Sequence, residues 1–193
     1  MSVRKTLAVV LGSGLLLGAA HVSATPPTAS MLADTCAGGH GPDGSSVGPA
    51  IPSIAGMSAE YFKTTMAEYK TGERYSTIMT RLAKGYTDEE IALMADFFAG
   101  KDFVRFAQDV DATKVKAGEK LYGKSCEKCH EDNGASPGDD AGILAGQWLP
   151  YLNYTMADFT SDRRDMPKKM KKKVEKLSAD DIEALMHFFA SQQ

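Results

Sequence analysis

An internal repeat is the feature of this sequence that most constrains its fold. Identical residues recur at an offset of 90, and after one extra residue in the second half the correspondence continues at an offset of 91. Self-similarity of this length is the signature of a duplicated structural unit. We therefore expect two related domains, residues 25–102 and 113–193, joined by a linker at 103–112. The pairs that matter below are Cys36 with Cys126, His40 with His130, Tyr61 with Tyr151, Arg74 with Arg164 and Met79 with Met170.

Both halves are expected to be helical, which gives an all-α fold. No run of five residues alternates in the way a half-buried strand does. Thr87 and Ser178 precede acidic residues, which is typical of a helix N-terminus, and each should open the last helix of its domain. Gly118 would allow an earlier helix to cross the last one closely. Apolar residues at three- to four-residue spacing predict the buried faces of the two last helices: Ile91, Met94, Ala95 and Phe98, then Ile182, Leu185, Met186 and Phe189.

Residues 1–24 have the pattern of a secretory signal peptide. Arg4 and Lys5 precede an apolar run from Leu7 to Ala20 and a cleavage site of small residues that ends at Ala24. The apolar run is shorter than the roughly 20 residues that span a bilayer, which argues against a membrane anchor. We expect cleavage after Ala24, export to the periplasm and no membrane span in the mature chain.

Composition excludes several other classes of protein. A hydrophobic content of 43% and a charged content of 24% fit a packed globular fold rather than a disordered or fibrous chain. The net charge of −3 argues against nonspecific binding of nucleic acid, which needs a basic surface. Three cysteines are too few for a disulfide scaffold and leave at least one without an intramolecular partner.

The most specific chemical signal is the C-x-x-C-H motif that runs from Cys126 through Cys129 to His130. In an exported protein this motif indicates covalent attachment of haem c. One helical turn can present both thiols to the porphyrin vinyl groups while the adjoining imidazole reaches the iron. The alternatives are a structural disulfide or a thioredoxin-like redox pair, and the latter would need a βαβ context that is absent. We predict thioethers at Cys126 and Cys129, with His130 as the proximal iron ligand.

The distal iron ligand must come from elsewhere in the chain. Methionine is a common partner of histidine in electron-carrying haems because this ligation raises the reduction potential. The repeat favours Met170, which lies seven residues before Leu177 as Met79 lies seven before Tyr86. Met166 is the competing candidate. With both axial positions filled, the iron would exchange electrons rather than bind oxygen.

The mature chain resembles the tandem dihaem cytochromes c of the class I fold, and in particular the cytochrome subunits of flavocytochrome c sulfide dehydrogenases. The resemblance implies a periplasmic electron-transfer subunit, itself not an enzyme, that accepts electrons from an FAD-containing flavoprotein which oxidises sulfide and delivers them to a downstream acceptor. The alternatives are a free soluble dihaem carrier that serves a terminal oxidase and a haem or metal sensor. The segments that carry the resemblance are Val47–Ala50, Ser76–Met79 with Ala83–Tyr86, Cys126–His130, Ile143–Trp148, Arg163–Met170 and Phe189–Gln193.

The first half departs from this pattern. It carries Cys36-Ala37-Gly38-Gly39-His40, so glycine replaces the second thiol. The site could hold haem through one thioether at Cys36 with His40 and Met79 as axial ligands, it could be empty, or it could bind copper, although a blue-copper site usually needs two histidines. The surviving ligands favour haem. Class I cytochromes also bond the proximal histidine near the position of Pro49, where the second half has Asp139, so the partner that orients His130 cannot be read from the sequence.

Basic residues gather around the expected distal ligand. They form either an ordinary solvated helix face or a positive rim that steers an acidic redox partner to the haem edge. The segment contains two acidic residues, Asp165 and Glu175, and eight basic ones: Arg163, Arg164, Lys168, Lys169, Lys171, Lys172, Lys173 and Lys176.

Overall fold

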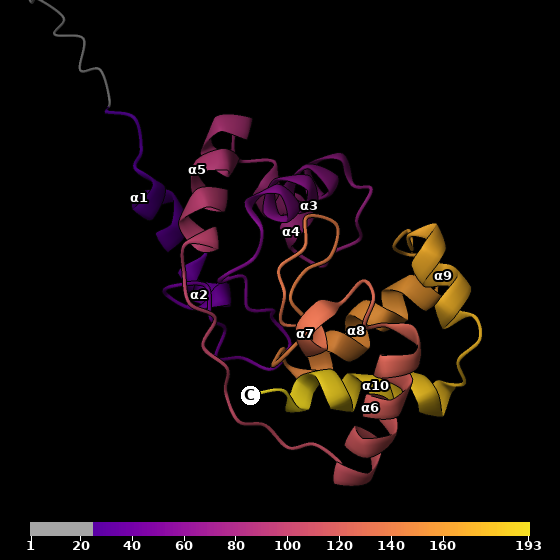
Figure 1. Cartoon of the computed structure of the whole chain (residues 1–193). Coiled ribbons are helices and arrows are strands. Elements are labelled where there is room, and N and C mark those ends of the chain that lie inside the picture. The colour runs from indigo at the N-terminus through magenta and orange to yellow at the C-terminus, as the bar shows by residue number, and fades with distance from the viewer. Residues whose placement is uncertain (1–24) are drawn as a thin grey trace, which may run out of the picture.

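The computed structural model describes residues 25–193 (Figure 1), and the predicted signal peptide at 1–24 lies outside the described residues. The described chain contains helices and loops without a β-strand, which confirms the all-α prediction. The helices of the first half are α1 (Ala29–Asp34), α2 (Ala37–His40), α3 (Ala59–Thr71), α4 (Met79–Ala83) and α5 (Asp88–Ala99). The second half repeats this order with α6 (Ala112–Ser125), α7 (Glu131–Gly134), α8 (Leu149–Thr160), α9 (Lys168–Val174) and α10 (Ala179–Ser191).

The last helix of each half begins where the sequence predicts. Thr87 caps α5, since its side chain accepts from the backbone N–H of Glu90 while the Glu90 carboxylate accepts from the N–H of Thr87. Ser178 and Asp181 form the same reciprocal pair at the start of α10. Each pair satisfies two amides that the helix leaves without an internal partner, so the local sequence fixes both starting points.

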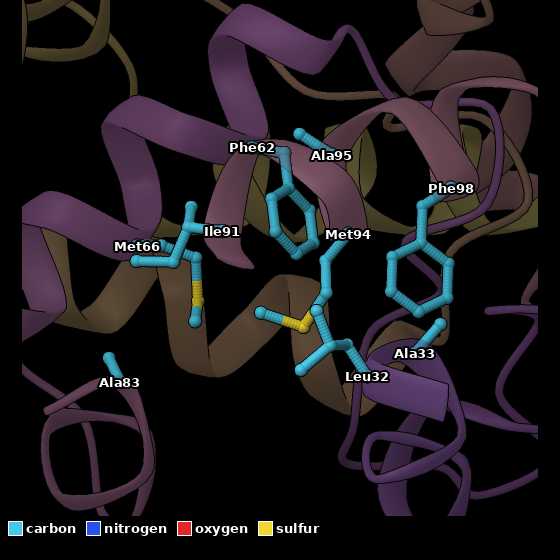
Figure 2. Close-up of a cluster of buried hydrophobic side chains, with 9 residues drawn as sticks. All are labelled: Leu32, Ala33, Phe62, Met66, Ala83, Ile91, Met94, Ala95 and Phe98. Atoms are coloured by element: carbon cyan, nitrogen blue, oxygen red, sulfur yellow. The ribbon is translucent and has the colours of Figure 1, made fainter. Parts of the chain in front are cut away.

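Each half has its own buried apolar cluster. In the first half α1, α3 and α5 pack their apolar faces together around Met94 and Phe98, which are fully buried (Figure 2). In the second half Tyr122 on α6 packs against Phe188 and Phe189 on α10. The predicted apolar faces are therefore the core faces, except at Ile182, which is only half-buried.

The crossing of α6 and α10 depends on Gly118, as expected. A Cβ atom built at Gly118 would lie 2.2 Å from the carbonyl oxygen of Ala184 and 2.7 Å from the Cβ of Phe188. Any side chain at this position would force the two helices apart. The packing brings the C-terminal end of α6, which leads directly into Cys126, into a fixed position relative to α10.

The segment between α5 and α6 is irregular and runs across both halves (Figure 1). The side-chain amide of Gln108 donates to the carbonyl oxygens of Gln147 and Ala190 and accepts from the N–H of Leu149. Phe106 stacks on Trp148 with ring centroids 6.2 Å apart. The connection is therefore packed against the second half rather than free in solvent. None of the helices in the described part of the chain is both long and apolar enough to cross a membrane.

Candidate haem-binding sites

The two histidine motifs share one pair of backbone hydrogen bonds, although Ala37–His40 form helix α2 whereas His130 precedes helix α7 with φ −116° and ψ 71°. In the second half the carbonyl oxygen of Cys126, the residue that ends α6, accepts from the N–H groups of Cys129 at 3.1 Å and His130 at 3.0 Å. In the first half the carbonyl oxygen of Cys36 accepts from Gly39 at 3.1 Å and His40 at 2.9 Å. Both motifs thus close one tight turn that brings the first cysteine and the histidine together, although only the second motif carries two thiols.

The cysteines are free and differ in exposure. Cys36 and Cys126 are half-buried against the first and second core clusters, and Cys129 is exposed. Burial raises the pKa of the Cys36 and Cys126 thiols. The structure therefore gives no support to the alternative of a disulfide between Cys126 and Cys129. Instead, it places one inner and one outer thiol beside His130, an arrangement that suits two attachment points on one flat group.

His40 is held in one orientation by the backbone. Its Nδ1 atom lies 2.8 Å from the carbonyl oxygen of Pro52. Because a carbonyl only accepts, Nδ1 must carry the proton, which leaves Nε2 as the nitrogen free to bind a metal. Burial lowers the pKa of His40 and so favours the neutral ring that ligation requires. The sequence pointed to the neighbourhood of Pro49, and the acceptor is found three residues later.

His130 has a different environment. Burial lowers its pKa, and the negative charge of Asp140 partly offsets that effect. The ring meets Phe189 edge-on at a centroid distance of 6.3 Å. Gly142 stands at the position that matches Pro52, and within the described residues the structure assigns no hydrogen bond to the His130 ring. The partner left open by the sequence analysis is therefore not supplied by the protein in this arrangement.

The candidate distal methionines lie in three different settings. Met79 begins α4 and packs, half-buried, against the same core cluster as Cys36. Met170 lies in α9 and is half-buried; the positive charge of Lys173, one turn further along that helix, reaches the Cys126 thiol. Met166 lines a hollow between α8 and α9 that contains none of the motif residues. These contacts associate Met79 with the first motif and favour Met170 over Met166 for the second.

A cluster of arginines and tyrosines lies between the two halves. The Arg74 guanidinium, only 5% exposed, donates to the Thr65 hydroxyl at 2.9 Å and lies over the rings of Tyr61 and Tyr69. Burial would raise the pKa of Tyr61, but the positive charges of Arg74 and Arg164 outweigh it and lower the pKa. Burial raises the pKa of Tyr151.

This cluster carries more positive charge than its carboxylates balance. The carboxylate paired with Arg74 is Glu68, at 3.5 Å and partly exposed. A buried guanidinium normally requires a close anion. The cluster therefore suits a bound group that brings its own carboxylates, such as the propionates of haem. The sequence identified these residues as repeat matches and Arg164 also as one of the basic residues around the distal ligand, but nothing in either half shows that the two copies meet.

Direct contacts hold the two halves together beside this cluster. The Gln147 side chain, fully buried, accepts from the N–H of Ser53 at 2.9 Å and donates to its carbonyl oxygen at 2.8 Å. Trp148 donates through its indole N–H to the carbonyl oxygen of Ser46 at 2.9 Å. Asp139, which replaces the matched proline, accepts from the Ser58 hydroxyl. The residue that departs from the repeat thus serves the contact between the halves.

Comparisons with known proteins agree with this arrangement. Residues 113–189 match the family described as cytochrome c oxidase, cbb3-type, subunit III. The cytochrome subunit of sulfide dehydrogenase from Chlorobaculum tepidum is 49% identical over 83 residues, which cover 42% of this chain and 74% of that protein. Cytochrome c4 from Azotobacter vinelandii is 30% identical over 206 residues, with 95% of each chain covered.

The fold is also found among solved structures. Reduced recombinant cytochrome c4 from Pseudomonas stutzeri has a TM-score of 0.75 and 26% identity, with 86% of this chain and 97% of that chain covered. The similarity spans both halves rather than the C-x-x-C-H motif alone, so it is not explained by that short motif. The chain therefore belongs to the c-type cytochromes built from two tandem class I domains, the family of cytochrome c4.

Proposed function

We propose that this chain is the periplasmic electron-transfer subunit of a flavocytochrome c, in which an FAD-containing partner oxidises sulfide and passes the electrons to this chain. The observation that most supports this proposal is the 49% identity to the cytochrome subunit of sulfide dehydrogenase. The chain itself is a carrier and not an enzyme. Its two units, residues 25–102 and 113–193, would each be built around one haem site.

In the second unit, Cys126 and Cys129 would hold haem c by two thioethers, and His130 and Met170 would be its iron ligands. Haem c supplies an iron that gains and loses one electron. His130 and Met170 would together leave no free position on the iron for oxygen, so the bound haem would serve electron transfer. The tight turn from Cys126 to His130 supports this assignment, as does the packing of both Cys126 and Leu177, which follows α9, against the second core cluster.

In the first unit, Cys36 would hold a second haem by a single thioether, and His40 and Met79 would be its iron ligands. The hydrogen bond from His40 to Pro52 supports haem over an empty site, because it leaves Nε2 free to bind the iron. Copper receives less support, because the first motif offers a single histidine and a blue-copper site usually needs two.

The propionates of the two haems would lie in the Arg74 and Arg164 cluster between the halves. Two guanidiniums and the hydroxyls of Tyr61 and Tyr151 offer the charge and the donors that carboxylates need. We assign to the haem propionates the role of neutralising this buried positive charge. The cluster would then place both haems close to the same interface.

Copurification tests the function. The mature protein is expressed together with the FAD-containing partner in a host with c-type cytochrome maturation. It should elute as a stable complex that contains FAD and whose haem is reduced when sulfide is added. The competing function is a free dihaem carrier that delivers electrons to a terminal oxidase. The similarity to cytochrome c4 over 95% of the chain favours this carrier. A haem-loaded monomer without FAD would decide for that carrier.

Iron content and intact mass test the two sites. We expect two irons per mature chain, with one haem on two thioethers and one on a single thioether. The pyridine haemochrome spectrum should mix the signatures of the two kinds of attachment. One haem per chain, bound only through Cys126 and Cys129, would remove the first site from the proposal and leave the second intact.

A further inference from the structure

A side-chain hydrogen bond joins two segments of the first half that are far apart in the sequence. The hydroxyl oxygens of Thr35 and Tyr86 lie 2.6 Å from each other. Thr35 directly precedes Cys36, and Tyr86 follows α4, the helix that Met79 begins. The bond therefore connects the cysteine segment and the methionine segment of the first candidate site.

The direction of this bond follows from a second one. The Thr35 hydroxyl donates its only proton to the carbonyl oxygen of Leu32 in α1, at 2.6 Å. Thr35 can then only accept from Tyr86, so the Tyr86 hydroxyl is the donor. Bonds in such a chain strengthen each other. The Thr35 oxygen also lies 3.9 Å from the Cys36 sulfur, so the chain of bonds passes beside the atom that would attach the haem.

Tyr86 is closely coupled to the helix that carries Met79. Its backbone N–H donates to the carbonyl oxygen of Ala83, the last residue of α4, at 3.3 Å. Ala83 is fully buried in the first core cluster. The ring of Tyr86 packs against the same cluster, as Met79 and Cys36 do. A restraint on the Tyr86 hydroxyl is therefore passed on to α4 and to Met79.

The second half has no equivalent of this bond. Ser125 occupies the position that matches Thr35, and Leu177 occupies the position that matches Tyr86. Leucine has no hydroxyl, and Leu177 packs against the second core cluster through its apolar side chain. The packing role of this position is thus fulfilled without a hydrogen bond. Of the two halves, the one with the bond is the one whose motif lacks the second thiol.

We propose that the Tyr86–Thr35 hydrogen bond positions Met79 as an iron ligand of the first haem and supplies part of the restraint that the missing thioether would give. This inference rests on the proposed function, because it assumes that the first site holds haem. A group attached at one point depends more on its axial ligands staying in place than a group attached at two. Tyr86 acts through α4 rather than by binding iron, so it is a positioning residue.

Removal of single hydroxyls tests the proposal. Tyr86→Phe keeps the ring that packs on the core and removes the donor, and Thr35→Val removes the acceptor at nearly constant shape. Tyr75→Phe is the matched control, because it makes the same chemical change four residues before Met79. The Tyr75 side chain is 44% exposed, and its ring, which phenylalanine retains, lies against the Arg163 guanidinium. Circular dichroism and iron content verify that each variant is folded and carries two haems.

Displacement of methionine by cyanide measures how firmly Met79 is held. All variants are made in a Met170→Ala background, so that the remaining methionine-to-iron absorption band reports the first haem. Halving of the band by Met170→Ala verifies that a single site is observed. Oxidised holoprotein is then titrated with potassium cyanide at constant pH.

Loss of either partner should loosen Met79 to the same extent. The net contribution of one hydrogen bond corresponds to roughly 3–10-fold in an equilibrium constant, so Tyr86→Phe should lose the band at a cyanide concentration lower by about that factor. Thr35→Val should do the same. The double variant should equal either single one, because all three lack the same bond. Tyr75→Phe should behave as the background protein does.

A restored thioether should make the bond dispensable. Gly39→Cys gives the first haem a second attachment point, and in its presence Tyr86→Phe should change the cyanide concentration by less than about 2-fold. A residue that only stabilises the fold of the first half would have the same effect with one thioether or two. This dependence separates a positioning role from a general contribution to stability.

Three results on protein that contains two irons would overturn the proposal and leave the proposed function intact. Equal effects of Tyr86→Phe and Tyr75→Phe would show a general response to loss of a hydroxyl. An undiminished effect of Tyr86→Phe beside Gly39→Cys would assign the bond to the fold. No effect of Tyr86→Phe would show that packing alone holds Met79. One iron per chain would instead overturn both the first haem site and this role. The experiment uses no flavoprotein, so its result is independent of whether the FAD complex forms.

Discussion

The two candidate haem-binding sites share a backbone turn but would restrain their ligands differently. In the first site one thiol is missing, while His40 is oriented by Pro52 and Met79 packs on the core. In the second site both thiols are present, while the matching acceptor position is Gly142 and Met170 lies on the lysine-rich helix α9.

The contrast shows two ways of restraining one group. Two thioethers restrict where a haem can lie, so His130 can be positioned by the covalent turn alone. With a single thioether, orientation of the axial ligands by hydrogen bonding and packing becomes more important. The first site retains these noncovalent restraints, which a decaying site would have no reason to preserve.

Removal of the distal ligand should have the largest effect on the second haem. We expect Met170→Ala to convert it from a six-coordinate to a weakly coordinated or high-spin state. Its potential should fall by a sizeable part of the roughly 0.8 V range that axial ligands control. Absorption spectra of the oxidised protein and a redox titration provide the measurements.

Met166→Ala is the matched control for that experiment. Met166 lines a hollow that contains none of the motif residues, so its loss should leave the iron six-coordinate. If instead the methionine-to-iron absorption band disappears only in the Met166 variant, the assignments of Met170 and Met166 must be exchanged.

Cys129→Gly should turn the second site into a copy of the first. The variant keeps Cys126 and His130 in the same turn but can form only one thioether. We expect a single-bond haemochrome signature at both sites and partial loss of haem from the second, because Gly142 supplies no equivalent of the Pro52 contact. Full retention would show that covalent attachment is not what holds this haem, and intact mass distinguishes the outcomes.

Gly39→Cys is the reverse experiment. A Cβ atom at residue 39 would have Ile51 as its nearest neighbour, at 3.6 Å, which is ordinary van der Waals contact. The first site therefore has room for the missing thiol, and the variant should bind its haem by two thioethers with unchanged iron content. Mass spectrometry of peptides that contain Cys36 measures the attachment, and Gly38→Cys, one residue out of register, is the control.

The sequence predicted those parts of the fold that depend on local signals. Thr87 and Ser178 begin the last helices because their capping partners lie three residues away. The apolar spacing that both halves carry predicted the buried faces of the two last helices. Gly118 was identified because its place before Leu121 and Tyr122 indicates a helix contact, and the structure supplies that contact with Ala184.

Features that depend on the contact between the halves could not be predicted. Arg74 and Arg164 occupy matched positions, but each half alone gives them no reason to gather with Tyr61 and Tyr151. The carbonyl of Pro52 was missed for another reason. A backbone acceptor leaves no side-chain signature, so only the path of the chain shows which residue faces His40.

The smallest expected effect concerns how the two halves pack their first and last helices. Gly118→Ala would place a methyl group against the Ala184 carbonyl and Phe188, so we expect a loss of on the order of 1–3 kcal/mol in the free energy of unfolding. Gly123→Ala, on the same helix with nothing within 4 Å, should instead stabilise by roughly 0.5–1 kcal/mol. In the first half Thr28, the N-cap of α1, occupies the position that matches Gly118, so only the second half has a glycine at this helix crossing. Guanidinium unfolding of the holoprotein followed by circular dichroism measures both changes. Equal midpoints for the two variants would mean that α6 can shift along α10 without cost, and the position of Cys126 would then be set by the haem rather than by the helix pair.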